Sequence, residues 1–328
     1  MHPTIVNIMC FMICVISQVR CKVHYGYGEG KEHWGYHGEG NYDPEDWSEE
    51  YQKCGGKRQS PINIDTRDTI WTSFEPFRFH HYKQTPVHIE HNGHTIKVEV
   101  DHKYTPEVKG GGLGGIYDFA HFHFHWGTDS THGSEHTIDG NSYPMEMHLV
   151  HYKSEYKNVS VAVSHSDGLA VLAILFKVSP KDNKALAPIL KSIKKVQEAH
   201  TDIDIKSSVP LSHLLPRNID RYFRYEGSLT TPTCNEVVTW TLFERPVHIS
   251  EEQLEMFRSL HTLNQSIPLT DNFRPMQEIN GRKVYRVERE LKRILLELGA
   301  QKPNGAHSVY HQVEIIVCLL LISITCFM

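Results

Sequence analysis

Histidine and phenylalanine alternate in "HFHFHW", residues 121–126, and this alternation strongly restricts how the stretch can fold. In an extended strand, the side chains at positions i, i+2 and i+4 share one face. His121, His123 and His125 would therefore stand in a row on one face of a strand. A row of imidazoles on one strand face suggests a metal site, although one metal ion need not bind all three.

Zinc binds imidazole well, and a catalytic zinc site has three protein ligands and one open position. Along a strand, residues i and i+4 lie about 13 Å apart, so His121 and His125 cannot easily bind the same ion. Two choices remain open, His121 with His123 or His123 with His125, each completed by a histidine from elsewhere. The stretch "MEMHLVH" supplies His148, and Glu146 two residues earlier suits a partner that orients its ring. The competing interpretation is a solvated, histidine-rich strand face.

Strand patterns dominate the rest of the chain. They occur at residues 94–100, 122–126, 145–152, 169–178 and 236–243. No low-complexity linker or internal repeat interrupts residues 22–304. We therefore predict a mainly β, mixed α/β fold: a single domain around a large, twisted, mostly antiparallel central sheet with short peripheral helices.

Two helices are predicted near the end of the domain. Ser250 and Gln253 form a capping box, and Ile249 and Leu254 are placed as a hydrophobic staple. The apolar stripe at 287, 291, 294, 295 and 298 predicts an amphipathic helix or stalk over residues 287–304. This places the main domain at residues 22–286.

The first 20 residues resemble a targeting segment. Their apolar run, Ile5–Ile16, is too short to span a bilayer and precedes polar Ser17 and Gln18. We expect a secretory signal peptide over residues 1–20. The alternative is an N-terminal membrane anchor.

The other end carries the parts of a glycosylphosphatidylinositol (GPI) attachment signal. The small residues Asn304, Gly305 and Ala306 precede a polar spacer and an apolar tail, Ile315–Met328. The tail is shorter than the roughly 20 residues of a membrane-spanning helix, and no charge follows it. We expect residues 305–328 to be removed and a lipid to be attached at Asn304, with a transmembrane span as the alternative.

Composition and cysteine usage agree with export. A net charge of −5 provides no basic footprint for nucleic acid, so we expect no nucleic-acid partner. Of seven cysteines, only Cys54 and Cys234 lie in the mature domain away from its ends, and in an oxidising compartment they are a natural disulfide pair. The alternative is two buried thiols. Asn158 and Asn264 begin N-glycosylation sequons.

Nine stretches of the chain together resemble the α-class carbonic anhydrases, over about residues 33–286. They are "HWGY" (33–36), "RQSPINI" (58–64), "NGHTIKVEV" (92–100), "FHFHWG" (122–127), "GSEHTIDG" (133–140), "EMHLVH" (146–151), "DGLAVL" (167–172), "GSLTTPTCNEVVTW" (227–240) and "NFRP" (272–275). The resemblance implies one Zn²⁺ per chain and reversible hydration of carbon dioxide to bicarbonate and a proton. It also implies inhibition by sulfonamides.

The resemblance assigns the zinc ligands to His123, His125 and His148. Glu146 would hydrogen-bond the ring of His148. His121 stands where the family usually has a glutamine that contacts the first zinc histidine, so the resemblance makes it a supporting neighbour and not a ligand.

Further catalytic roles also follow from the resemblance. Thr230 would hydrogen-bond the nucleophile and donate to Glu135, and Thr231 would be a neighbouring substrate contact. Glu135 could otherwise be an ordinary buried carboxylate, which would need a partner. The apolar carbon dioxide pocket would comprise Val150, Val171, Leu229, Val238 and Trp240, which could equally be plain core residues.

The proton path is the last part that the resemblance supplies. His94 stands where fast family members carry a proton shuttle, and an imidazole suits that task. A lone loop histidine is otherwise usually solvated surface. Tyr36 and Asn92 match residues that order the water chain. The resemblance also pairs Cys54 with Cys234.

Departures from the family pattern are His121, Phe273 in place of the common tryptophan, and Lys97 at a variable position of the pocket wall. The leading hypothesis is an active zinc enzyme at the extracellular face of the plasma membrane, held there by a lipid anchor. The alternatives are a non-catalytic carbonic-anhydrase-like binding or adhesion module and a histidine-rich metal-buffering surface protein.

Overall fold

Each of the five stretches with a strand pattern forms a strand. The computed structural model describes residues 34–36, 43–207, 209–262 and 267–288. The "HFHFHW" stretch lies in the long strand β7 (Tyr117–Trp126), which pairs antiparallel with β9 (Met145–Lys153). β7 is rich in aromatic residues, which fit a pleated, half-buried surface.

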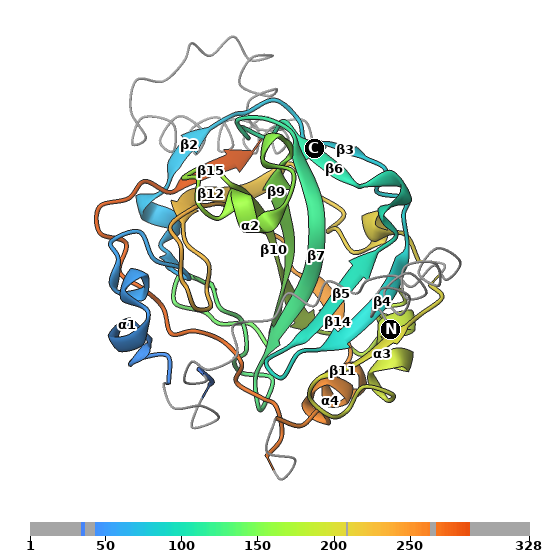
Figure 1. The fold of residues 1–328 in the computed structure, drawn as a ribbon. Coiled ribbons are helices and arrows are strands. Elements are labelled where there is room, and N and C mark those ends of the chain that lie inside the picture. The colour runs from blue at the N-terminus through green and yellow to red at the C-terminus, as the bar shows by residue number, and fades with distance from the viewer. Residues whose placement is uncertain (1–33, 37–42, 208, 263–266, 289–328) are drawn as a thin grey trace, which may run out of the picture. The chain divides into compact units, whose positions relative to one another are not determined.

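The sheet is large and mixed (Figure 1). Within the described part of the chain it has thirteen strands. Its main path runs in the order β11 (Thr201–Asp204), β4 (Pro86–His91), β5 (Ile96–Val100), β7, β9, β10 (Leu169–Val178), β13 (Val238–Phe243), β12 (Arg221–Gly227), β15 (Tyr285–Glu288) and β2 (Ile70–Thr72). Off this path, β14 (Val247–Ile249) pairs with β10, β6 (Glu107–Lys109) with β7, and β3 (Arg78–His80) with β6. The β10–β13, β10–β14 and β15–β2 pairs are parallel and the others antiparallel, which confirms the predicted mostly antiparallel sheet.

The other elements are short and lie around this sheet (Figure 1). A separate parallel pair joins β1 (Asn63–Ile64) to β8 (Thr137–Ile138). The α-helices are α1 (Trp47–Glu50), α2 (Val159–Ala162), α3 (Ala187–Ile193) and α4 (Glu251–Arg258). The 3₁₀ turns are η1 (Gln52–Gly55), η2 (Thr66–Asp68), η3 (His102–Tyr104), η4 (Ser154–Tyr156) and η5 (Leu211–His213). Within the described ranges, none of the helices has the length and apolar character needed to cross a membrane.

The two faces of β7 have different surroundings. Phe122 and Phe124 face a large buried core that also contains Leu254 and Phe257 of α4. The alternate face carries the histidines. Because side chains alternate along a strand, burial of the phenylalanines against the helices leaves the histidine row on the opposite face.

The predictions for the end of the domain met with different outcomes. The capping box at α4 is confirmed, because Gln253 N donates to Ser250 Oγ and the Gln253 side chain accepts from Ser250 N. The predicted helix start at Val287 is wrong: Val287 and Glu288 lie on β15, where Val287 pairs with Tyr222 of β12. The backbone hydrogen bonds available between β12 and β2 override the helical spacing of the apolar residues there. The remainder of that predicted helix lies outside the described residues.

Several further predictions lie outside the described residues. They are the signal peptide, Asn264, Asn304 and the lipid-anchor signal.

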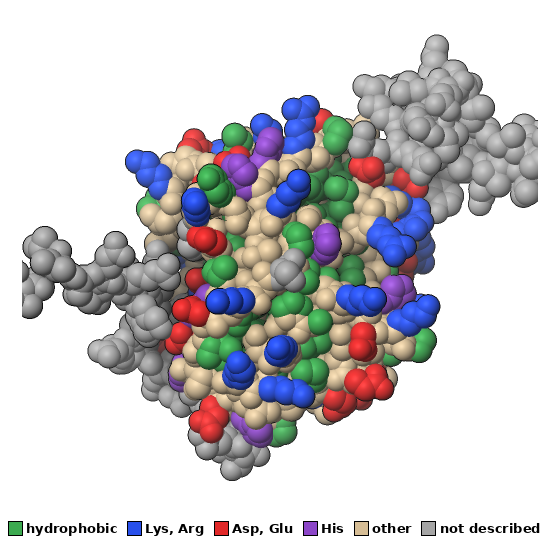
Figure 2. Space-filling view, turned by 90° about the vertical axis from the view of Figure 1, so that its right-hand side faces the viewer, with side chains coloured by type: hydrophobic (Ala, Val, Ile, Leu, Met, Phe, Trp, Pro, Cys, Tyr) green, Lys and Arg blue, Asp and Glu red, His purple; other side chains and the backbone are tan. Residues whose placement is uncertain are grey.

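Over the face shown in Figure 2, the Lys and Arg side chains stand among Asp and Glu side chains.

Candidate metal centre

Three histidines from two neighbouring strands converge on one point. His123 and His125 come from β7, and the β7–β9 register sets His148 directly opposite His123. One ring nitrogen from each histidine lies within 4.8 Å of the others. This arrangement selects the 123/125 pair from the two that strand spacing left open, with His148 as the third member.

Hydrogen bonds orient two of these rings. His125 Nδ1 lies 2.7 Å from the carbonyl oxygen of Asn272, so this nitrogen is the donor and Nε2 keeps its lone pair. His148 Nε2 lies 2.7 Å from Glu146 Oε1, which leaves the lone pair on Nδ1. The two lone-pair nitrogens lie 3.2 Å apart. Such partners fix the tautomer and orientation of a metal-ligating imidazole.

Burial favours the neutral form that binds a metal. It lowers the pKa of His125 and, together with the charges of His125 and His148, holds the pKa of His123 well below its ordinary value. A metal ligand must be unprotonated. Burial therefore favours the metal-binding form of these two histidines, and a set of three imidazoles suits zinc.

Glu146 is a fully buried carboxylate with two histidine partners. Besides His148, it accepts from His136 through its ring nitrogen Nδ1 at 2.6 Å and its backbone nitrogen at 2.8 Å. Burial raises the pKa of Glu146, but the charge and hydrogen bond of His136 and the hydrogen bond of His148 outweigh burial and hold it well below its usual range. The predicted Glu146–His148 contact is therefore present, with a carboxylate that stays ionised.

His121 lies beside this cluster. Its ring centroid is 5.3 Å from that of His123, and no hydrogen bond joins the two among the described residues. Loss of solvation lowers the pKa of His121 to about 3, and the charge of Lys97 adds to the effect. Its supporting role therefore stays a prediction.

Glu135 is buried beside His125 and His148. Its Oε1 accepts from the backbone nitrogen of Arg274 at 2.9 Å and lies 3.6 Å from His125 Nδ1. Its Oε2 lies 3.9 Å from His148 Nδ1 and is buried without a hydrogen-bond partner in the described structure. Thr230 is also buried, and no hydrogen bond joins it to Glu135 within the described ranges. A buried carboxylate oxygen without a hydrogen-bond partner, beside this histidine cluster, fits a site built around a cation and a hydroxyl donor.

The residues of the predicted apolar pocket lie together next to the histidines. In the sheet register, Val150 of β9 stands opposite His121, Val171 of β10 opposite Val150, and Trp240 of β13 opposite Val171. Val238 belongs to the same buried cluster, and Leu229 packs against it. This row is adjacent to the row that holds His123 and His148.

The three residues of the predicted proton path also lie together. The His94 ring stacks on Trp34, with centroids 3.9 Å apart, and its centroid lies 6.3 Å from that of Tyr36. Asn92 Oδ1 accepts from the backbone nitrogens of His94 and Thr95, which closes the turn that carries His94. Gly93 in this turn has φ of +94°, a conformation that favours glycine.

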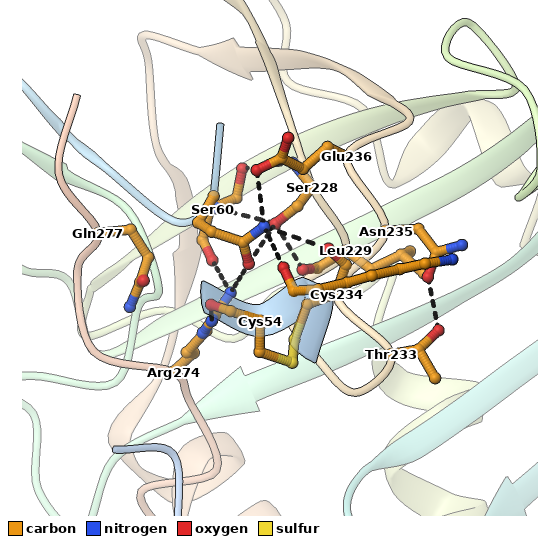
Figure 3. The surroundings of a disulfide bond; sticks show 12 residues. Cys54, Ser60, Ser228, Leu229, Thr233, Cys234, Asn235, Glu236, Arg274 and Gln277 are labelled. Carbon is orange, nitrogen blue, oxygen red and sulfur yellow. Dashed lines mark hydrogen bonds between the residues drawn. A yellow bond between two sulfur atoms is a disulfide. The ribbon is translucent and has the colours of Figure 1, made fainter. Parts of the chain in front are cut away.

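The disulfide predicted between Cys54 and Cys234 is present, with Cα atoms 4.9 Å apart (Figure 3). It joins η1 to the loop that contains Thr230 and Thr231. Gln59 also spans the two segments, since its side chain donates to the carbonyls of Lys53 and Cys234. The loop is therefore held by a covalent bond and by hydrogen bonds.

Three residues of the site received no role from the sequence: His136, Asn272 and Arg274. The Arg274 guanidinium donates to Gln59 Oε1, Ser60 O and Cys54 O, and so links the disulfide segment to the chain that holds Glu135 (Figure 3). All three lie in the motifs "GSEHTIDG" and "NFRP", which were the available signal. Their partners are distant in the chain, so spacing alone could not reveal them.

Comparisons with known proteins agree with this geometry. The family model described as "Eukaryotic-type carbonic anhydrase" matches residues 42–288. The chain is 38% identical to carbonic anhydrase 15 of Mus musculus over 255 residues, 74% of this chain and 78% of that protein. It is 38% identical to carbonic anhydrase 1 of Mus musculus over 76% of this chain and 97% of that protein. It is 36% identical to putative carbonic anhydrase 3 of Caenorhabditis elegans over 78% of this chain and 98% of that protein. With this match over most of its length and a three-histidine cluster at its centre, the chain belongs to the eukaryotic-type carbonic anhydrase family.

Proposed function

We propose that this protein is an active carbonic anhydrase that binds one Zn²⁺ through His123, His125 and His148 and hydrates carbon dioxide reversibly. The observation that carries the proposal is the convergence of three imidazole nitrogens within 4.8 Å, two of them oriented by hydrogen bonds at the opposite ring nitrogen. Zinc in such a site supplies Lewis-acid chemistry that makes water a nucleophile near neutral pH, as known for this family.

Glu135 and Thr230 orient the reacting water in this proposal. The unpartnered Glu135 Oε2 is a ready acceptor for the Thr230 hydroxyl hydrogen. The Thr230 oxygen is then left as an acceptor for the O–H of the attacking water, which directs a lone pair of that water toward the carbon of carbon dioxide. Arg274 holds Glu135 in place through its backbone nitrogen.

The apolar row beside the histidines receives the substrate. Val150, Val171 and Trp240 form an apolar surface that water solvates poorly. Carbon dioxide has no net charge and therefore suits such a surface. Thr231, which follows Thr230 in the chain, is a polar contact for the substrate in this proposal. Sulfonamide-type inhibitors, to which the family is sensitive, would occupy the same space.

His94 moves the proton that each turnover releases. Its stacking on Trp34 and its position near Tyr36 support a ring held at the edge of the site. An imidazole can accept and release a proton close to neutral pH.

The protein acts at the outer cell surface in this proposal. The disulfide agrees with an oxidising compartment. Asn158 caps α2 through Oδ1, which accepts from Val161 N, so its Nδ2 remains the atom for a glycan. The signal peptide, glycosylation and GPI anchor at Asn304 complete the proposal and rest on the sequence patterns alone.

Stopped-flow measurement of carbon dioxide hydration, with and without a zinc chelator, tests the catalytic part. We expect activity that the chelator abolishes and that added zinc restores. Folded, fully zinc-loaded protein without activity would contradict the proposal and favour the non-catalytic binding module.

Release from cells by a phosphatidylinositol-specific phospholipase tests the anchor. A known GPI-anchored protein on the same cells is the control. If the control is released and this protein stays on the membrane, the lipid anchor is wrong.

A further inference from the structure

A charged lysine stands on the same sheet face as the metal-binding histidines. Lys97 of β5 pairs directly with His123 of β7 on one side and with Glu90 of β4 on the other. Residues directly opposite each other in an antiparallel pair project to the same face and lie next to each other. No strand therefore separates the Lys97 side chain from the first histidine of the cluster.

Two carboxylates hold the Lys97 ammonium. Lys97 Nζ lies 2.8 Å from Glu99 Oε1 and 3.4 Å from Glu90 Oε2. Glu99 stands two residues along β5, and therefore on the same face. The Lys97 side chain is only 26% exposed, so the three charges form a partly buried group at the wall of the site.

The lysine keeps its charge in this position. Burial disfavours the charged ammonium, but the hydrogen bond and charge of Glu99 and the charge of Glu90 outweigh burial and raise the pKa of Lys97. This charged side chain starts directly opposite His123 in the β5–β7 register. A fixed positive charge therefore acts on whatever binds next to His123.

Carbon dioxide is neutral and bicarbonate is an anion, so a fixed charge distinguishes the two ends of the proposed reaction. We propose that Lys97 is a specificity residue for anions: it strengthens the binding of bicarbonate and other small monovalent anions at the histidine centre, and Glu90 and Glu99 limit this attraction. This inference rests on the proposed function, because the anion binds where the histidines hold the metal. It predicts that product release and anion inhibition depend on these three residues.

Removing the lysine charge and removing its two counter-charges should change the affinity for anions in opposite directions. Lys97→Gln removes the positive charge and leaves Glu90 and Glu99 to repel an anion. The double substitution Glu90→Gln and Glu99→Gln leaves the ammonium without its counter-charges. Since the charges lie at the wall of a partly dehydrated site, each change should alter anion affinity by roughly fivefold.

Thiocyanate is the probe. Its Kd for the cobalt(II)-substituted protein is measured from the visible absorption of the cobalt. Bicarbonate inhibition of carbon dioxide hydration is measured on the zinc-loaded protein as a second readout. We expect Lys97→Gln to raise the Kd about fivefold, Lys97→Arg to restore it, and the double Gln variant to lower it by a similar factor. Lys83→Gln, at an exposed lysine between β3 and β4, makes the same change in net charge and should leave the Kd within about twofold.

The outcomes separate this inference from the proposed function. If the wild-type protein hydrates carbon dioxide but the Kd for thiocyanate is the same in all variants, the role of Lys97 is wrong and the enzyme stands. If Lys97→Gln does not fold, the double Gln variant decides: unchanged or weaker anion binding overturns the inference. A wild-type protein that binds no metal overturns the proposed function, and this inference with it.

Discussion

Hydrogen-bond partners distinguish three histidines that look equivalent in the row 121, 123 and 125. His125 donates to a backbone carbonyl and directs its other nitrogen at His148. His123 stands opposite His148 across the β7–β9 pair, whereas His121 stands opposite apolar Val150. Identical side chains on one strand face therefore have different tasks, because the neighbouring strand offers each a different partner.

The first prediction compares two substitutions in this row. His123→Ala removes one of the three proposed ligands, so the zinc content should fall from the expected one ion per chain to near none after dialysis. His121→Gln should keep one zinc per chain, because that side chain is not a ligand. Metal analysis of the purified, folded variants measures both. Full zinc content in His123→Ala would show that the cluster is not the binding site.

The second prediction concerns the proton path. His94→Ala should slow turnover in weak buffer by roughly ten- to a hundredfold, since a positioned acid–base group contributes about 10²-fold or more. Imidazole added to the solution should restore much of the rate. Stopped-flow hydration at low and high buffer concentration measures this. If neither the rate nor the rescue changes, another group carries the proton.

At the scale of elements, one strand pair organises both the site and the core. β7 and β9 bring the histidines together on one face, while Phe122, Phe124 and Leu149 lie in the core on the other. A shift of one residue in this register would exchange the two faces. The helices α3 and α4 cover the core face and therefore secure the register that builds the site.

The third prediction tests the start of α4. Ser250 Oγ accepts from Gln253 N and donates to Asp182 Oδ1. Ser250→Ala removes this N-cap and should lower the free energy of unfolding by about 1 kcal/mol. Urea denaturation measures it, with Ser166→Ala at an exposed position as the control. Equal stability of the two variants would mean that the cap is dispensable.

At the scale of the whole molecule, the disulfide links parts of the chain that are 180 residues apart. It restricts the unfolded chain and fastens the loop with Thr230 and Thr231 to η1. This long-range link and the Arg274 hydrogen bonds act on the same segment.

The fourth prediction removes that link. The double variant Cys54→Ser and Cys234→Ser should lose about 2–5 kcal/mol of unfolding free energy, because closing a long loop reduces the entropy of the unfolded chain. Urea denaturation measures the loss. Wild-type protein in reducing agent should behave like the double variant, and a loss near zero in both would contradict the role of the bond.

The fifth prediction concerns acid stability. Burial lowers the pKa of His151 to about 4, although backbone carbonyls of Ala170 and Leu149 oppose this. Below the ordinary pKa of about 6.5, the unfolded chain takes up a proton that the folded protein does not. This contribution to stability is complete above pH 6.5 and is lost as the pH falls toward 4. Between pH 7 and pH 5 the loss amounts to about 2 kcal/mol.

His151→Gln removes that titration. The variant should be less stable at pH 7, since its hydrogen bonds to Tyr82 and Leu149 change. Between pH 7 and pH 5, the free energy of unfolding of the variant should fall by about 2 kcal/mol less than that of the wild type. His213→Gln, at an exposed position, is the control. Parallel pH profiles for wild type and His151→Gln would refute the assignment.

Much of the fold followed from local patterns. The strands at 122–126, 145–152 and 169–178 and the capping box at Ser250 depend on neighbouring residues in the chain, so they could be predicted. Val287 was assigned to a helix because its apolar spacing fits one, yet it pairs with β12 and β2. Which partner strand is available cannot be derived from periodicity.

The sequence by itself determined that three histidines share a strand face, that His148 lies near a carboxylate, and that two cysteines remain to pair. These properties depend on the two-residue period of a strand and on counting. Strand spacing left open whether His121 or His125 joins the cluster; the family resemblance favoured His125, and the structure places it there. Only the tertiary structure decided that His136, Asn272 and Arg274 support the cluster and that Lys97 stands next to His123. The reason is physical: side chains far apart in the chain become neighbours only when strand register and core burial are set for the whole sheet.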